Sequence, residues 1–474
     1  MKKIKIFSSR VPKNTPNRQN AASYRTEKAN IIQIYGFNFL GVSLTGSFSG
    51  VMSSALVPMI LLCGTYFIIY LRGFFIFRPK KCAALVASGG RRSLRELSVS
   101  LAGALGVGNI VGVAVAISAG GAGAVFWMWV SAAVSAVLKY CEIILALKFR
   151  EKNGGEYVGG PMYYMRDGMG GASGKALACI YAALGVVSSA TLGNVVQSGA
   201  VTAAASEAGV PPSVAATVMC VLCALVVFGG FSGVSRFTGA AVPIMSVLYI
   251  AVSLRAIVMC AENIPAAFSA IFSEAFRFDS AAGGVLGFLT SSAVRSGTSK
   301  GAFSHEAGSG TAPMAHIQAE PEFPAAQGLG GMIEVVFDTL VMCTLTALVI
   351  LTSGAFDGAC SGAELVTRAF EATCGGAAKY IISLSVSLFA FSTVICWSYY
   401  GRICLSFFSR SRRAEKAYLC FYCAAIPLGA VISEGRVWEL ADISVTLMTA
   451  INLAAVFCLR GHVRRETKQT FGKK

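Results

Sequence analysis

The residues of this chain that could do chemistry are ionisable side chains inside long apolar segments. Lys139 and Glu142 are three residues apart in one segment, Glu334 and Asp338 share a helix face in another, and Arg255 lies in a third. Charges inside apolar segments are costly and mark candidate ion paths or buried ion pairs. The spacing allows Lys139 and Glu142 to pair with each other. Structural pairing, placement near a helix end and an ion path all stay open for each residue.

Two other patterns suggest chemistry and are rejected. Ser304, His305 and Glu306 are adjacent in the sequence, whereas a hydrolytic triad needs groups that converge in space. Two cysteine pairs have the spacing of metal ligands, but both lie in apolar segments without a nearby histidine, which favours ordinary packing: Cys220 with Cys223, and Cys420 with Cys423. We therefore predict no catalytic residue and no protein-held transition metal.

The composition identifies the elements that must position these residues. Of 474 residues, 55% are hydrophobic and 13% are charged. An ordinary globular chain is about 25% charged, so a soluble fold would lack polar surface. The net charge of +17 comes from tails and loops rather than from a basic helix face, so we expect no nucleic-acid partner. The chain is predicted to be an all-α integral membrane protein in a lipid bilayer.

Apolar segments of the right length define the spans, because a transmembrane helix needs about 20 predominantly apolar residues. Eleven candidates lie near 51–71, 99–119, 122–148, 177–203, 212–231, 239–262, 281–294, 329–353, 378–400, 416–433 and 437–459. The seventh crosses only if it continues past a break. Residues 1–30 are polar, which argues against a cleavable signal peptide. The predicted organisation is a polar basic tail over 1–48, one transmembrane domain over 49–460, and a basic tail over 461–474.

Lysine and arginine in the loops predict the orientation, because cytoplasmic loops carry an excess of both. The loop after the first span carries seven of them: Arg72, Arg78, Lys80, Lys81, Arg91, Arg92 and Arg95. Odd-numbered loops are in general richer than even-numbered ones. We therefore predict a multi-pass protein of the cell membrane with a cytoplasmic C-terminus and an extracellular N-terminus. The basic N-terminal tail does not fit this orientation.

Glycines interrupt two of the spans. The second span carries Gly106, Gly108 and Gly112, and the seventh carries Gly283, Gly284 and Gly287. Each interrupted span is the first of a set of five, which predicts two repeats of inverted topology, about 99–262 and about 281–459. Interrupted helices at matching positions indicate the binding site of a secondary transporter. Their unwound backbone offers N–H groups to a carboxylate and C=O groups to a cation. Close helix packing through small residues is the alternative.

Several motifs occur in order from about residue 50 to residue 460. They include Gly106-Val-Gly-Asn-Ile-Val-Gly-Val-Ala114, Gly301-Ala-Phe-Ser-His-Glu-Ala-Gly-Ser-Gly-Thr-Ala-Pro313 and Phe389-Ala-Phe-Ser-Thr-Val-Ile-Cys-Trp-Ser-Tyr-Tyr-Gly401. They resemble the sodium:alanine (alanine or glycine:cation) symporter family of the amino acid–polyamine–organocation superfamily. This chain departs from the family pattern at Val107 (usually Thr), His305 (usually Asn), Ala122 (usually Pro) and Arg402 (usually Glu).

The resemblance implies a leucine-transporter-type fold, with a 5+5 inverted-repeat core and one peripheral helix, consistent with the eleven spans. It implies symport of a small neutral amino acid, alanine or glycine, into the cell by alternating access. Sodium would be the coupling ion, with no other cofactor, and a monomer is expected to suffice. A proton-coupled transporter of the same fold is the alternative, followed by a channel or a sensor. Neither the substrate's handedness nor its identity within this class follows from the sequence.

By this resemblance, the two interruptions hold the substrate. Gly106, Val107, Gly108 and Asn109 would offer backbone groups and one amide, and Gly283, Gly284 and Gly287 would do likewise from the other side. Gln197 matches a polar position of the family on the fourth span. Thr393 and Trp397 are four residues apart, so both can line one wall, where the indole would limit substrate size. Packing is the alternative role for Trp397.

The resemblance also implies a sodium site made only of oxygen atoms, which a hard cation prefers. The backbone carbonyls near Ala102 and Leu105 would supply part of it, and the hydroxyls of Ser392 and Thr393 the rest. The alternative is that these hydroxyls bond to their own helix. The polar loop Ser304–Glu306 is expected to close the cytoplasmic end of the pathway.

Overall fold

The computed structural model describes residues 39–87, 90–153, 155–277, 291–358, 360–432 and 434–471. The chain divides into a short N-terminal unit, Met1–Gly50, and a large unit, Val51–Lys474. In the short unit, the described residues form the beginning of helix α2 (Phe39–Tyr70).

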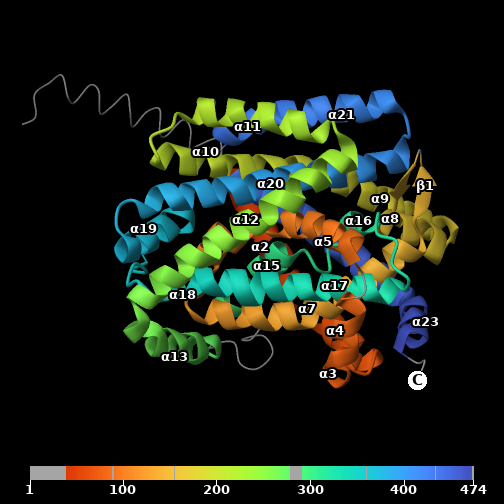
Figure 1. Ribbon diagram of the computed structural model, residues 1–474, viewed down its shortest axis with the longest axis horizontal. Coiled ribbons are helices and arrows are strands. Elements are labelled where there is room, and N and C mark those ends of the chain that lie inside the picture. The colour runs from red at the N-terminus through yellow and green to blue at the C-terminus, as the bar shows by residue number, and fades with distance from the viewer. Residues whose placement is uncertain are drawn as a thin grey trace, which may run out of the picture. The chain divides into compact units, whose positions relative to one another are not determined.

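Long apolar helices make up most of the large unit (Figure 1). Lipid offers no hydrogen bonds to the backbone, so a spanning segment must satisfy its own N–H and C=O groups, as a helix does. Among the described residues, six segments are long and apolar enough to span: Gly123–Lys148, Gly171–Glu207, Gly230–Met259, Pro324–Thr352, Ala378–Phe408 and Glu439–Cys458. Shorter apolar helices are Ser54–Tyr70, Val111–Gly120 and Pro212–Val227. A helical, multi-pass membrane protein is confirmed, while the count of eleven stays a prediction.

These segments correspond to the following elements. Three are single helices, α7 (Gly123–Lys148), α12 (Gly230–Met259) and α20 (Ala378–Phe408). One joins α9 (Gly171–Ala190), the π-helical segment η3 (Thr191–Val196) and α10 (Gln197–Glu207). Another joins α17 (Pro324–Val335), the π-helical η5 (Val336–Cys343) and α18 (Thr344–Thr352). The last lies within α22 (Glu434–Cys458). The shorter apolar helix Pro212–Val227 is α11.

The predicted interruption of the second span is present. Helix α5 (Gly90–Ala104) ends, a single 3-10 turn η1 (Val107–Asn109) follows, and α6 (Val111–Gly120) resumes. Glycine is required here because the segment lies against α20. A Cβ atom at Gly106 would lie 2.6 Å from Thr393 Oγ1, and one at Gly103 would lie 2.6 Å from the Tyr400 hydroxyl.

A second interruption lies between α15 (Ser292–His305) and the short helix α16 (Pro313–His316). Glu306 has a φ of 54°, in the left-handed region, and Gly308 and Gly310 have φ values of 94° and 80°. The chain cannot continue as a right-handed helix through such residues. The predicted break residues Gly283, Gly284 and Gly287, and most of the span predicted at 281–294, lie outside the described residues.

The remaining elements connect and flank these helices. They are α3 (Phe74–Phe77), α4 (Pro79–Ala87), strands β1 (Glu151–Asn153) and β2 (Glu156–Val158), α8 (Pro161–Tyr163), η2 (Tyr164–Met169), η4 (Ala261–Asn263), α13 (Ile264–Ala275), α19 (Gly362–Cys374), α21 (Arg412–Ala425), η6 (Ile426–Ala430) and α23 (Arg460–Phe471). The strands form an antiparallel hairpin with Glu151 opposite Val158. The basic C-terminal segment is the helix α23, and it contacts α7 through the hydroxyls of Tyr140 and Thr467, 2.9 Å apart.

Helix α7 is buried along most of its length, and both α15 and α17 pack along it. Figure 1 shows it beside α17. Helix α20 packs against α9, α10 and α12, and also against α5 of the first interrupted helix. The interrupted helices are therefore positioned by α7 and α17 on one side and by α20 on the other.

Candidate functional site

A small cavity lies where the two interruptions approach α10 and α20. Its lining consists of Gly103, Ala104, Gly106, Gly108, Leu192, Gln197, Phe303, Glu306, Thr393 and Trp397. Its volume is about 10 Å³, which is roughly the space that one water molecule needs. Of the residues predicted for the substrate site, Gly106, Gly108, Gln197, Thr393 and Trp397 are thus brought together.

The first interruption is held by side chains of distant helices. The Val107 N–H donates to Oε1 of Gln197 at 3.2 Å, and the Gly106 N–H donates to Oδ1 of Asn109 at 3.1 Å. The Asn109 amide in turn donates to Oδ1 of Asp338 at 2.6 Å. Val107 and Asn109 are buried but do not line the cavity. The amide expected to face the substrate is therefore engaged by Asp338.

The second interruption places a carboxylate in the cavity. Oε1 of Glu306 accepts a hydrogen bond from the Trp397 indole N–H at 2.8 Å, and Oε2 accepts one from the Thr311 hydroxyl at 3.1 Å. Glu306 is 5% exposed and is the one carboxylate among the lining residues. The sequence analysis placed Glu306 in a closing loop and missed this role. Gly308 and Gly310, which follow it before Pro313, repeat the glycine spacing of the first interruption and could have indicated it.

The Thr393 hydroxyl lies among backbone carbonyls. Its Oγ1 is 3.0 Å from the carbonyl oxygen of Ala102, 3.3 Å from that of Leu105 and 3.1 Å from that of Phe389. One hydroxyl hydrogen serves only one of these oxygens at a time. The group is therefore rich in oxygen and poor in donors, as a site for a hard cation should be.

Ser392 does not join this group of oxygens. Its hydroxyl donates to the Phe389 carbonyl of its own helix at 2.8 Å and lies 3.6 Å from the sulfur of Met245 on α12. Ser392 and Thr393 are consecutive, so they point to different sides of α20, and only one can face α5.

The buried charges pair differently from the sequence prediction. The Lys139 ammonium lies 2.8 Å from Oε2 of Glu334, and both side chains are fully buried. Glu142 instead accepts a hydrogen bond from the Asn452 amide at 2.5 Å. Of the roles left open for Lys139, the structure shows a buried ion pair, but with Glu334 of α17 rather than with Glu142. Arg255 is exposed on α12.

Asp338 is held by neutral donors. Its Oδ2 accepts hydrogen bonds from the hydroxyls of Ser304 and Thr339, both at 2.8 Å. Because its Oδ1 binds Asn109, the carboxylate connects the first interruption with the end of α15. Glu334 makes a separate set of contacts, which includes Ser100 at 2.7 Å and His316 at 3.1 Å.

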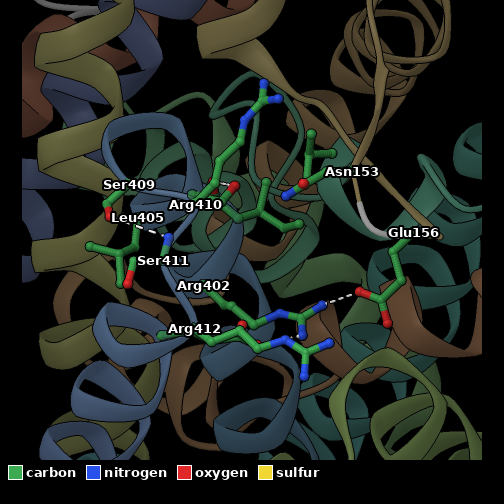
Figure 2. Close-up of a pocket in the computed structure, with 12 residues that line it drawn as sticks. Asn153, Glu156, Arg402, Leu405, Ser409, Arg410, Ser411 and Arg412 are labelled. Carbon is green, nitrogen blue, oxygen red and sulfur yellow. Dashed lines mark hydrogen bonds and ion pairs between the residues drawn. The ribbon is translucent and has the colours of Figure 1, made fainter.

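The departures from the family pattern have defined surroundings. Arg402 lies outside the cavity, where it pairs with Glu156 of β2 (Figure 2). It also pairs with Glu415 of α21 at 2.8 Å. Figure 2 shows this guanidinium turned toward Glu156, beside a pocket of about 330 Å³. The Ala122 N–H donates to Glu274 at 2.8 Å, a bond that proline could not make. His305 contacts Ser131 and accepts from the Ala307 N–H.

Comparison with known proteins supports a common origin over nearly the whole described chain. The family model described as the sodium:alanine symporter family matches residues 39–474. A sodium/alanine symporter, AgcS, of Methanococcus maripaludis is 36% identical over 429 residues, which cover 86% of this chain and 93% of the relative.

Other relatives carry different names. A probable sodium/glutamine symporter, GlnT, of Bacillus subtilis is 33% identical over 416 residues, which cover 86% of each chain. A putative sodium/proton-dependent alanine carrier protein, YrbD, of the same organism is 33% identical over 391 residues, which cover 79% of each chain. The matched region contains both interruptions and α20.

Proposed function

The chain belongs to the sodium:alanine symporter family, and we propose that it imports alanine or glycine together with sodium. Membership makes it a membrane transporter of the amino-acid symport class. The identities of the substrate and of the coupling ion are what we propose beyond this membership. The observation that carries it is the cavity between the two interruptions, with Glu306 on one side and Gln197 and the first interruption on the other.

The two ends of an amino acid match the two sides of the cavity. The ammonium group would pair with the Glu306 carboxylate, and a charge-assisted hydrogen bond in a buried site is strong. The carboxylate would approach the first interruption, where α6 begins and a helix N-terminus carries partial positive charge. There it would compete with Gln197 for the Val107 N–H.

The Trp397 wall of the cavity favours the smallest amino acids. At about 10 Å³ it admits no amino acid as it is, so the Trp397 side chain must move and release Glu306 before substrate enters. The indole then remains as one wall, which disfavours long side chains. From this closed state the cavity would open first toward one side of the membrane and then toward the other. This sequence of states is called alternating access.

Sodium would bind at Thr393. The hydroxyl and the carbonyl oxygens of Ala102 and Leu105 would be its ligands in this proposal, with Ser392 left out. The carbonyls belong to the helix that ends at the first interruption. An ion there would steady the backbone that faces the substrate carboxylate, which is a physical basis for coupling.

The remaining architecture is proposed as the family implies it. The proposal comprises a leucine-transporter-type core of two inverted five-helix repeats, a peripheral helix, eleven spans and a functional monomer. The domain boundaries are those given above, with tails over 1–48 and 461–474. The C-terminus would be cytoplasmic and the N-terminus extracellular, in the cell membrane. Reporter fusions at both ends test the orientation, and two termini on one side would contradict it.

Uptake into proteoliposomes tests the function. Labelled alanine should accumulate when a sodium gradient is imposed, and it should not accumulate with a proton gradient alone. Unlabelled glycine should compete, and glutamine should not. Accumulation driven by protons without sodium would support the proton-coupled alternative. Absence of any alanine, glycine or glutamine uptake by correctly inserted protein would reject the proposal.

A further inference from the structure

The buried charges of the large unit do not balance. Among the residues that the structure describes, Lys139 is the one lysine or arginine that is buried, and its ammonium is already paired with Glu334. The carboxylates of Glu142, Glu306 and Asp338 are buried as well, with exposed fractions of 0%, 5% and 0%. A buried carboxylate needs a cation, a proton or several donors, because lipid and protein solvate it poorly.

Two of these carboxylates have a partner of that kind. Asp338 accepts hydrogen bonds from Asn109, Ser304 and Thr339. Glu306 lines the cavity, where a substrate ammonium would meet it. Glu142 differs from both. Its Oε1 accepts one hydrogen bond, from Asn452 at 2.5 Å, and its Oε2 is buried without a hydrogen-bond partner.

The ionisable groups around Glu142 supply no free positive charge within the described chain. The groups that act on it electrostatically, or on which it acts, are Lys139 and Cys141 on α7, Tyr164 on η2 and Tyr181 on α9. Lys139 is committed to Glu334, and the others are neutral or acidic. Helix α22 contributes the neutral Asn452 amide.

These surroundings suit a proton better than a metal ion. The Asn452 amide presents its N–H to Glu142, and the N–H groups of Gly308 and Gly310 face the same carboxylate, whose Oε2 has no hydrogen-bond partner. N–H groups cannot ligate a cation, and their positive ends repel one. A proton needs no ligand shell, and it removes the charge altogether.

We propose that Glu142 is a proton-binding site, protonated in this conformation, whose proton is released and rebound during the transport cycle. On release, the O–H bond of the carboxylic acid breaks and an O–H bond to a water molecule forms, which gives a carboxylate and a hydronium ion. Rebinding reverses both changes, and no other bond forms or breaks. The coupling to transport rests on the proposed function, whereas the protonation itself does not.

Hydrogen bonds, together with the backbone between Gly308 and Ser309, connect Glu142 with the cavity through the second interruption. The Asn452 amide that binds Glu142 also donates to the Gly308 carbonyl at 2.8 Å. Within the interruption, the Ser309 and Thr311 hydroxyls are 2.8 Å apart, and Thr311 donates to Glu306. A new charge on Glu142 would draw water toward Gly308 and favour opening of this segment. Protonation would favour the closed state.

Infrared spectroscopy of the purified proteins tests the protonation of Glu142 without any transport. The spectrum of each variant is subtracted from that of the wild type. The wild-type protein should show a C=O stretching band of a buried carboxylic acid that Glu142→Gln lacks. Glu466→Gln removes a carboxylate on the neighbouring α23 that pairs with Lys148 of α7, and it should leave the band unchanged. Identical carboxylic-acid bands in wild type and Glu142→Gln would overturn the proposal. If Glu142→Gln does not fold, Glu142→Asp must shift the band, and an unshifted band would overturn it equally.

Uptake at different pH values tests the coupling. At saturating sodium, wild-type alanine uptake should rise about threefold or more from about pH 5.5 to about pH 8.5, as the site loses its proton. Glu142→Gln should remain at the low-pH rate throughout. Asn452→Ala should retain a carboxylic-acid band, shifted because Glu142 has lost its hydrogen-bond donor, but should lose the pH dependence of uptake. An unchanged pH profile in Glu142→Gln would overturn the coupling, whereas failure of wild-type uptake at every pH would instead reject the proposed function.

Discussion

The two interruptions that line the cavity are held in place in different ways. The first is held mainly from outside, by Gln197 of α10 and Asp338 of η5, with one local bond from the Gly106 N–H to Asn109, and its own residues carry no charge. The second is held partly by its own side chains, since Ser309 donates to the Glu306 carbonyl at 2.7 Å and Thr311 donates to the Glu306 carboxylate.

This difference suggests a division of work within the site. A segment held by neighbouring helices keeps its geometry only as long as those helices keep theirs. A segment that bonds to itself can shift as a unit, and here it carries the charge. We therefore expect the first interruption to set the position of substrate and sodium. The second is expected to supply the charge and to open.

The largest effect is expected from removal of that charge. Glu306→Gln keeps the shape of the side chain but loses the charge, and we expect the efficiency of alanine uptake to fall about 100-fold, or about 3 kcal/mol, as for a lost charged hydrogen bond. Concentration-dependent uptake at saturating sodium measures it. Glu306→Asp should retain more activity than Glu306→Gln. Wild-type kinetics in Glu306→Gln would show that the second interruption does not supply the charge.

The next largest effect is expected at the Thr393 hydroxyl, which lies among backbone carbonyl oxygens beside the first interruption. Thr393→Val keeps the branched shape but removes Oγ1, and the sodium concentration for half-maximal uptake should rise about tenfold, or about 1.4 kcal/mol. Apparent alanine affinity should also fall, because linkage between two ligands is reciprocal. The titration is made at saturating alanine.

Ser392→Ala is the matched control for Thr393→Val. It removes the neighbouring hydroxyl, which bonds to its own helix, and should leave the sodium titration unchanged. Equal shifts in both variants would place sodium between the two hydroxyls, as the sequence analysis predicted. A shift in neither would move the ion elsewhere.

A smaller effect is expected where the first interruption is held from outside. Gln197→Met fills similar space but leaves the Val107 N–H without its acceptor, and we expect alanine uptake to fall about fivefold, or about 1 kcal/mol. Ser198→Ala, the adjacent buried residue whose hydroxyl bonds to the Val195 carbonyl, should transport normally. Normal uptake by Gln197→Met would mean that this interruption keeps its geometry without support.

The smallest effect is expected at the bond that closes the cavity. Trp397→Phe loses the N–H that donates to Glu306 but keeps an aromatic wall, so alanine uptake should change by about threefold or less. Trp397→Ala should additionally broaden the range of competing amino acids. If competition by larger amino acids stays as weak in Trp397→Ala as in wild type, Trp397 is a packing residue.

Part of this site was predictable because its signals are local. Glycine spacing predicted the interruption at Gly106–Asn109, since glycine weakens a helix wherever it occurs. The separation of Thr393 and Trp397 placed both on one face of a helix, and the structure brings both to the cavity. The same glycine signal was present after Glu306, but adjacent polar residues directed the interpretation toward a loop.

Pairing between distant segments could not be predicted in this way. Helical spacing brought Glu142 within reach of Lys139, yet the lysine binds Glu334, nearly two hundred residues away in the chain. The Asn109 amide was expected at the substrate and is held by Asp338. In each case the spacing defines the helix face, whereas the choice of partner depends on which other helix packs there.

The sequence by itself determined the class of protein, the membrane helices and the first interruption, because hydrophobicity and backbone flexibility are properties of a residue and its near neighbours. Only the tertiary structure decided that Thr393 rather than Ser392 faces the Ala102 carbonyl, that Glu306 enters the cavity, and that Oε2 of Glu142 is buried without a hydrogen-bond partner among the described residues. These features depend on the packing of α7, α17 and α20 around the two interruptions. Burial and the distance between charges exist only once those helices have come together.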